Sequence, residues 1–346
     1  MIPVKSTSTT EAEPARSQLL REGRSWQREL LEAVTDVDEL LRLVALDPSD
    51  IRTAVEPSAD FPLRVPRPYI ARMGRGDPDD PLLRQVLPTS RETEPAIGYG
   101  FDPLGEAAAV VDAGILRKYD GRALVIATGS CAVHCRYCFR RHFPYADHRQ
   151  DRRFESIAAL RRDSTIREVI LSGGDPLMLT DAHLARLLAE LGSIDHVARI
   201  RIHTRVPVVI PQRVTPALTE TLANLPQRVV VVLHFNHPNE IDRDCATSLT
   251  GLRRFTLLNQ SVLLRGVNDD AHTLVELSER LFGAGLLPYY LHMPDAVAGT
   301  AHFDVSQRRA VALHRQIQAR LPGYLVPRLV REVPGGNAKE LVIDDG

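Results

Sequence analysis

The sequence predicts an α/β fold, namely a partial (β/α)6 barrel of the TIM type with an N-terminal helical extension. From residue 122 onward, apolar runs rich in β-branched residues alternate with helical patterns; these runs cover 123–128, 168–174, 198–204, 228–235, 261–266 and 286–293. The clearest helical patterns cover 182–192 and 273–285. Continuous rather than alternating hydrophobicity is typical of parallel strands covered by helices on their faces. Repeated βα units with right-handed crossovers fit a barrel or a part of one.

The chain before residue 106 has a different character. Apolar residues recur at helical spacing in 25–34 and in 37–46, and Asp36 is placed to cap the second of these helices. Residues 56–105 are rich in Pro, Gly and Asp, which favours a packed irregular connection. We therefore divide the chain into an N-terminal helical and irregular segment, 1–105, and a barrel segment, 106–346.

Composition limits the classes of function. The 346 residues are 44% hydrophobic and 25% charged with a formal net charge of −1, which is typical of a soluble globular chain. Because there is no long basic run, we expect neither a dedicated nucleic-acid surface nor a membrane surface. The N-terminal residues are polar and no apolar run reaches membrane-spanning length, so we expect a cytoplasmic protein.

Three of the four cysteines, Cys131, Cys135 and Cys138, lie within eight positions on the loop after the first barrel strand. Such clustering favours ligation over a secreted disulfide framework, and core packing has little use for it. One alternative is a structural zinc site, with His134 or His142 as the fourth ligand. The other is an iron–sulfur cluster in which three thiolates hold three irons and the fourth iron stays open. The remaining cysteine, in "DRDCATS", is interpreted as a small filler residue.

Polar residues also follow the other predicted strands, where a barrel places its functional groups. The residues concerned are Gly173 to Asp175, His203 to Arg205, His234 and Asp295. We therefore expect these side chains to gather with the cysteines at one end of the barrel.

The spacing Cys-x3-Cys-x2-Cys after a first strand resembles the signature of radical S-adenosylmethionine enzymes. The resemblance implies a [4Fe–4S] cluster whose open iron binds the amino and carboxylate groups of S-adenosylmethionine. The stretch "SGGDPL" resembles the glycine-rich element that contacts the methionine amino group in that family, which selects Ser172, Gly173, Gly174 and Asp175. His234 matches a position near the adenosylmethionine.

Seven motifs between residues 65 and 340 are similar, in order and wording, to those of lysine 2,3-aminomutases. They include "CRYCFRRHFPY", "HTRVPVVIPQRVTP", "HFNHPNE" and "PGGNAK". The match is strongest to the branch of that family that makes (R)-β-lysine for modifying elongation factor P. The resemblance implies an isomerase that moves the amino group of L-α-lysine from Cα to Cβ.

The family also uses pyridoxal 5′-phosphate, which needs a lysine for a Schiff base. Lys339 in "PGGNAK" matches that catalytic lysine. Arg122 matches the residue that binds the cofactor phosphate, and Tyr119 and Gln260 match other cofactor positions. Glycines beside the lysine allow close approach of the backbone to the phosphate.

The resemblance assigns substrate contacts as well. Arg140 matches the residue that pairs with the lysine carboxylate, a task that suits the guanidinium fork. Asp295 and Glu332 match the two acids at the ε-ammonium. This chain departs from typical lysine 2,3-aminomutases in two places, since Glu332 replaces Asp and Tyr137 replaces His.

Free lysine is therefore the expected substrate, an electron donor such as flavodoxin the expected reductant, and an elongation factor P lysyl ligase a possible functional partner. Two alternatives stay open at this point. A radical aminomutase for another amino acid, such as glutamate, would keep Lys339 but not need Asp295. A zinc-stabilised interaction protein would bind neither iron nor pyridoxal phosphate.

Overall fold

The computed structural model describes residues 25–51, 54–55, 57–106, 110–112, 115–117, 119–145 and 153–344. Within these ranges the chain forms a ten-stranded sheet whose strands neighbour one another in chain order. The strands are β1 (Val110–Asp112), β2 (Ile115–Leu116), β3 (Arg122–Thr128), β4 (Glu168–Gly173), β5 (Arg199–Thr204), β6 (Arg228–Leu233), β7 (Thr256–Val262), β8 (Leu287–His292), β9 (Arg328–Arg331) and β10 (Glu340–Leu341).

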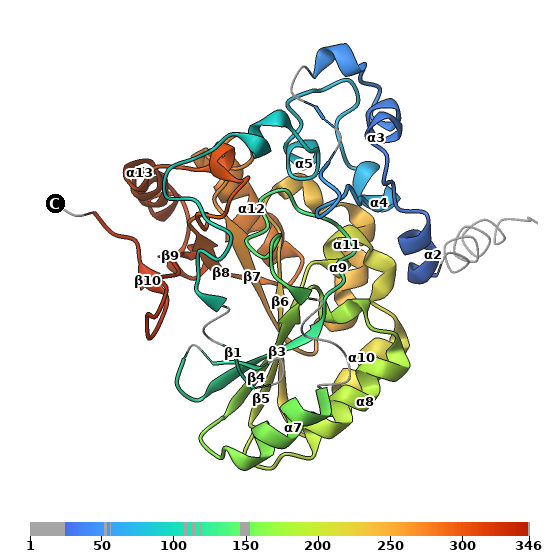
Figure 1. The fold of residues 1–346 in the computed structure, drawn as a ribbon, viewed down its shortest axis with the longest axis vertical. Helices are drawn as coiled ribbons and strands as arrows, with labels where there is room; N and C mark the ends of the chain where they lie inside the picture. The colour runs from blue at the N-terminus through green and yellow to red at the C-terminus, as the bar shows by residue number, and fades with distance from the viewer. Residues whose placement is uncertain are drawn as a thin grey trace, which may run out of the picture.

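Strands β3 to β9 run parallel, whereas β1, β2 and β10 pair antiparallel at the two ends of the sheet. No pairing joins β1 to β10 in the part of the chain that the structure describes, so the sheet stays open (Figure 1). This arrangement confirms the predicted partial barrel. It adds the parallel strand β9, which the sequence analysis did not predict.

Helices precede the sheet in the chain and also follow most of the parallel strands. They are α2 (Trp26–Leu31), α3 (Val37–Leu43), α4 (Arg67–Ile70), α5 (Pro81–Arg84), α7 (Arg153–Arg162), α8 (Asp181–Gly192), α9 (Val206–Val209), α10 (Pro216–Ala223), α11 (Arg243–Leu249), α12 (Ala271–Gly283) and α13 (Gln307–Gln318). Figure 1 shows α7, α8 and α10 along one flank of the sheet, with the N-terminal elements α2 to α5 gathered towards the opposite end. The helices predicted over 182–192 and 273–285 are confirmed as α8 and α12.

The N-terminal expectations also hold. Both predicted helices are present but shorter than their apolar pattern, and the Asp36 carboxylate accepts the backbone N–H of Glu39 at 2.7 Å, so it caps α3 as expected. Val34, at the end of the first pattern, instead bridges Val65 outside any helix. In its described residues, the Pro- and Gly-rich stretch forms short helices, turns and isolated bridges.

One strand is displaced from its predicted position. The sequence analysis placed a strand over 261–266, whereas β7 spans Thr256–Val262. Two side chains in β7 are buried and polar: Asn259 accepts the backbone N–H of Phe235 at 2.8 Å, and the Ser261 hydroxyl donates to the Phe235 carbonyl at 2.7 Å. These polar groups interrupt the run of apolar residues in β7. The sequence analysis looked for continuous apolar residues and therefore placed the strand over the turn that follows it.

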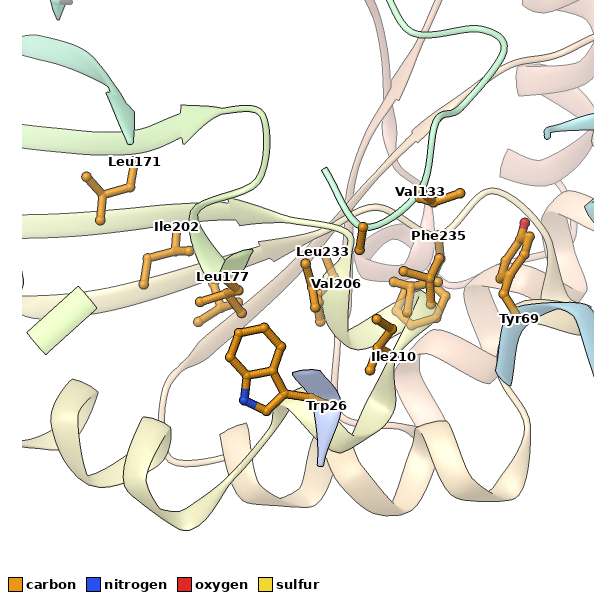
Figure 2. Close-up of a cluster of buried hydrophobic side chains, with 14 of the residues drawn as sticks. Trp26, Tyr69, Val133, Leu171, Leu177, Ile202, Val206, Ile210, Leu233 and Phe235 are labelled. Carbon is orange, nitrogen blue, oxygen red and sulfur yellow. The ribbon is translucent and has the colours of Figure 1, made fainter. Parts of the chain in front are cut away.

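The barrel and the N-terminal segment contribute to one hydrophobic cluster (Figure 2). Trp26 from α2 lies in this cluster near Leu177 and Ile210, and the Arg213 guanidinium lies 4.4 Å from the centre of its ring. The proposed division after residue 105 stays a prediction. Among the described residues, no helix is both long and apolar enough to cross a bilayer.

Candidate functional site

A cavity of about 470 Å³ lies inside the partial barrel. It is lined by every site residue that the sequence analysis selected: Tyr119, Arg122, Cys131, Cys135, Cys138, Arg140, Ser172, Gly173, Gly174, Asp175, His234, Gln260, Asp295, Glu332 and Lys339. These residues come from segments far apart in the chain. The fold therefore brings the predicted cluster loop and the predicted cofactor lysine to one cavity.

The cysteine loop leaves β3 and is held from outside the barrel. The backbone N–H of Arg136 donates to the Gln85 carbonyl at 2.8 Å, and that of His134 donates to the Arg64 carbonyl at 3.1 Å. The Arg136 side chain is fully buried and pairs with Glu92. The irregular N-terminal segment thus fixes the loop that carries the three thiols.

The thiols lie in an environment that disfavours isolated thiolates. Burial raises the pKa of Cys131 well above its ordinary value and that of Cys138 to about 11. A thiolate at these positions therefore needs a positive counter-charge, which iron ions in a cluster provide. The three cysteines, all in reach of one cavity, fit an iron–sulfur cluster by the chemistry of their donor set.

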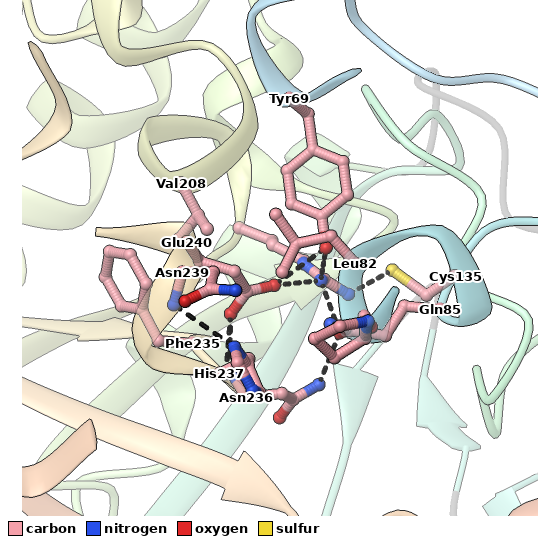
Figure 3. A network of polar contacts seen from close by, with 12 residues as sticks. Tyr69, Leu82, Gln85, Cys135, Val208, Phe235, Asn236, His237, Asn239 and Glu240 are labelled. Atoms are coloured by element: carbon pink, nitrogen blue, oxygen red, sulfur yellow. Dashed lines mark hydrogen bonds and ion pairs between the residues drawn. The ribbon is translucent and has the colours of Figure 1, made fainter. Parts of the chain in front are cut away.

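A buried polar network surrounds Cys135 (Figure 3). Arg205, directly after β5, donates one Nη1 hydrogen to Cys135 Sγ at 2.8 Å. Its guanidinium also donates to four further side chains, those of Tyr69, Gln85, Tyr137 and Glu240. The sequence analysis marked Arg205 as a strand-end residue but gave it no role. Its contact with a cysteine 70 positions earlier has no local sequence signal.

Close approach of the backbone requires glycine both at the end of β4, Gly173, and directly after it, Gly174. Gly173 has φ +116°, and a Cβ on Gly174 would lie 2.3 Å from the Ser130 carbonyl oxygen. The buried Asp175 carboxylate accepts the Thr204 hydroxyl at 2.7 Å and the Arg205 N–H at 2.6 Å. This element therefore ties the loops after β3, β4 and β5 together, while its contact with S-adenosylmethionine stays a prediction.

Arg140 has a protein partner that the sequence analysis missed. Its Nε and Nη2 donate to the two carboxylate oxygens of Glu106 at 2.7 and 2.8 Å, and its Nη1 donates to the Ser172 hydroxyl at 2.9 Å. Both charged side chains are buried. Glu106 is the first residue of the predicted barrel segment, ahead of the first predicted strand, where no periodic pattern singles it out. The predicted pairing of Arg140 with a substrate carboxylate is untested, and Glu106 would share that guanidinium.

At another part of the cavity, Lys339 Nζ forms an ion pair with Glu332. Tyr119 hydrogen-bonds the same carboxylate, and burial together with the negative charge of Glu332 raises the tyrosine pKa. The Arg122 guanidinium lies 4.8 Å from the centre of the Tyr119 ring. Glu332, which the resemblance assigned to the substrate ammonium, thus contacts the predicted catalytic lysine.

Three half-buried histidines complete the wall. Burial lowers the pKa of His234 and of His292 to about 3, and lowers that of His203 well below its usual value, so all three are neutral near pH 7. Gln260 Nε2 lies 3.4 Å from His234 Nε2. Nε2 of His203 and of His292 is buried without a hydrogen-bond partner among the described residues. Such orphaned nitrogens are suited to a polar ligand.

Asp295 follows β8 and is half-buried at the cavity wall. Its backbone carbonyl accepts the Val297 N–H at 2.8 Å, which forms a tight turn. The turn leads into a bridge between Val297 and Gly100, so the acid sits on a segment braced against the N-terminal region.

Comparison with known proteins gives consistent results. The model of the Radical SAM superfamily matches residues 125–276, from within β3 to within α12. The chain is 49% identical to the L-lysine 2,3-aminomutase of Escherichia coli K12 over 322 residues, covering 91% of this chain and 93% of that protein. It is 45% identical to the L-lysine 2,3-aminomutase of Haemophilus influenzae, covering 93% and 97% of the two chains. Identity to the Clostridium subterminale L-lysine 2,3-aminomutase is 33%, over 92% of this chain and 77% of that protein.

Proposed function

Because the chain belongs to the L-lysine 2,3-aminomutase family of Radical SAM isomerases, we propose that it converts L-α-lysine into (R)-β-lysine with pyridoxal phosphate as a cofactor. The observation that carries the proposal is the single cavity lined by both the cysteine triad and Lys339. When bound, the [4Fe–4S] cluster with S-adenosylmethionine supplies hydrogen abstraction by an adenosyl radical, and pyridoxal phosphate supplies a conjugated system that carries the migrating nitrogen.

The cysteine end has one task, which is to hold the cluster and leave one iron free. Cys131, Cys135 and Cys138 would each bind a different iron. The bonds from the loop to Gln85 and Arg64 fix the loop, so the thiols do not have to be ordered when the cluster binds. Gly174 has no side chain and its backbone packs closely against Ser130. The adjoining wall is therefore formed by backbone alone, which leaves space for a ligand.

The other end would hold pyridoxal phosphate. Lys339 is the residue that would attach it, and Arg122 would bind its phosphate. Arg122 fits this role because its guanidinium lines the cavity and forms no ion pair with any described residue. The neutral His203 and His292 add hydrogen-bonding capacity without adding charge.

Asp295 and Arg140 would orient lysine between the two ends. An ammonium in this cavity needs a carboxylate partner, since an unpaired buried charge is heavily penalised. Asp295 supplies one. Glu332 can pair with the substrate only to the extent that its ion pair with Lys339 is broken. Arg140 would share its guanidinium between Glu106 and the substrate carboxylate. The surrounding buried walls keep water away from the reacting centre.

We further propose that the β-lysine is used for modification of elongation factor P and that a flavodoxin-type donor provides the electron. The resemblance to the elongation factor P branch supports both statements. A coupled assay with the lysyl ligase and elongation factor P, fed with lysine through this enzyme, tests the first statement by mass spectrometry of the modified factor.

The central test is the reaction itself. Anaerobically reconstituted protein, supplied with dithionite, S-adenosylmethionine and L-lysine, is expected to form β-lysine, whose R configuration is established by chiral derivatisation. Omission of pyridoxal phosphate should abolish product. Glutamate offered instead should give no β-amino acid; turnover of glutamate but not lysine would contradict the proposal.

A further inference from the structure

We propose that Arg205 raises the reduction potential of the cluster by donating a hydrogen bond to Cys135 Sγ. The proposal rests on the cluster-binding part of the proposed function and adds a residue to which no role has been given. Arg205 is a positioning residue here, because it acts through a ligand rather than on the substrate. The donor nitrogen lies 2.8 Å from the sulfur.

The guanidinium is held rigidly in this orientation. Only 7% of Arg205 is exposed. Its Nη2 donates to Glu240 Oε1 at 2.7 Å and to Gln85 Oε1 at 2.8 Å. At the backbone, Asp175 accepts the Arg205 N–H at 2.6 Å. Because the side chain is fixed at both ends, its N–H points at the sulfur without an ordering cost when the cluster forms.

The acids and amides around it are fixed too (Figure 3). Glu240 is fully buried and its Oε2 accepts the backbone N–H of Asn236 at 2.6 Å. The Asn236 side chain donates to the Tyr137 hydroxyl at 2.7 Å, and Tyr137 also accepts from Arg205. Besides the sulfur, the guanidinium therefore bonds one anionic side chain, Glu240, and three neutral ones, and the cation itself contacts the sulfur.

The direction of the effect follows from charge. On reduction the cluster gains one electron from a low-potential one-electron donor, dithionite in the assay, and no bond or proton is exchanged at Arg205. Its total charge becomes more negative by one unit. A hydrogen bond and a buried positive charge at a ligand sulfur favour the more negative state, so they raise the potential. Glu240 opposes this effect through its negative charge.

Two variants in one background isolate the arginine. Glu240→Gln removes the opposing charge but keeps an oxygen acceptor for Arg205, so it should raise the equilibrium constant for reduction. Adding Arg205→Met to Glu240→Gln should lower that constant at least tenfold relative to Glu240→Gln alone, which corresponds to about 59 mV for a one-electron couple. The double variant lacks both charged side chains, so neither charge is left buried without its partner.

The measurement is a mediated redox titration of the anaerobically reconstituted cluster without S-adenosylmethionine, followed by visible absorbance and electron paramagnetic resonance. Arg205→Lys, which keeps the charge but not the fork, should lie between wild type and the double variant. Arg213→Lys is the matched control, because Arg213 is also buried but donates to the Leu177 and Leu179 carbonyls rather than to sulfur. It should leave the potential unchanged.

The outcomes separate this inference from the proposed function. Wild-type protein without iron after reconstitution would overturn the proposed function and this inference with it. Variants at Arg205 that bind wild-type amounts of iron, yet stay within twofold of their reference in the reduction constant, would overturn this inference alone. If the double variant does not fold, Arg205→Lys measured against Arg213→Lys decides the question by the same twofold criterion.

Discussion

Arg205 and Arg122 both line the same cavity, yet their surroundings differ completely. Arg205, at the cysteine end, is buried and bonded to four side chains in addition to the sulfur. Arg122, at the lysine end, is half-buried, and among the described residues its guanidinium contacts the face of the Tyr119 ring but forms no ion pair. A guanidinium whose two terminal nitrogens both donate to protein groups is part of the framework, whereas one with free donors is ready for an anion.

The two ends of the cavity therefore differ in how firmly their side chains are held. At the cysteine end, backbone and side-chain bonds fix the loop before any cluster binds. At the lysine end, Lys339 has one carboxylate partner and a ring, contacts that can be given up when a ligand arrives. Substitutions at one end should therefore leave the function of the other end measurable, and the following experiments test that independence.

The largest effect is expected from the cysteine triad. Replacing Cys131, Cys135 or Cys138 by Ala should abolish formation of 5′-deoxyadenosine and remove most of the roughly four irons expected per chain. Pyridoxal phosphate should still bind to Lys339 in these variants. Cys245→Ala is the control, since this thiol is buried in the hydrophobic core and donates to the Pro207 carbonyl at 3.8 Å, away from the triad. A triple Ala variant that keeps its full iron content and holds no stoichiometric zinc would contradict the assignment.

Lys339→Ala should lose nearly all aminomutase activity while retaining the cluster. The chain has only three lysines, so borohydride reduction followed by peptide mapping gives an unambiguous result. The pyridoxyl group should appear on the peptide that contains Lys339 and vanish in the variant. Labelling of Lys118, which lies outside the described residues, would instead show that the motif match is misleading.

Asp295→Asn should keep both iron and pyridoxyl labelling but lower kcat/KM for lysine by about two to four powers of ten. Removing one partner of a buried ion pair costs roughly 3–5 kcal/mol, and about 1.4 kcal/mol corresponds to a factor of ten. Steady-state kinetics with lysine and norleucine measure the loss. Asp304→Asn serves as the control, because Asp304 does not line the cavity. Lysine turnover within a few-fold of wild type would contradict the assignment of Asp295 to the ε-ammonium and favour a substrate without a side-chain ammonium, such as glutamate.

The smallest effect is expected from Tyr119→Phe. The variant keeps the ring beneath the Arg122 guanidinium and loses only the hydrogen bond to Glu332. A hydrogen bond of this kind contributes about 0.5–1.5 kcal/mol, so affinity for pyridoxal phosphate should fall roughly two- to tenfold. A spectrophotometric titration checks this expectation, with the exposed Tyr324→Phe as the control. A loss of several hundredfold would mean that the hydroxyl contacts the cofactor directly.

Local patterns predicted much of the fold and the membership of the site. Helical periodicity placed α8 and α12, the Asp36 cap was correct, and apolar runs located five of the parallel strands within a few residues. The pattern failed at β7, where buried Asn259 and Ser261 break the apolar run, and at the short β9, which has Arg at both ends. Hydrophobic periodicity fails where a strand directs polar side chains into the interior.

The sequence by itself identified a subset of the residues that line the cavity. Cysteine spacing and strand-end position, which are local properties, selected some of them, and the family resemblance selected the others, such as Arg122 and Lys339. Only the tertiary structure decided how those residues are paired. Arg205 with Cys135 and Arg140 with Glu106 are separated by 70 and 34 positions, and each pairing depends on how segments distant in the chain pack against one another. A charged side chain in a sequence can pair with any opposite charge; burial in one cavity, where an unpaired charge is penalised, selects the partner.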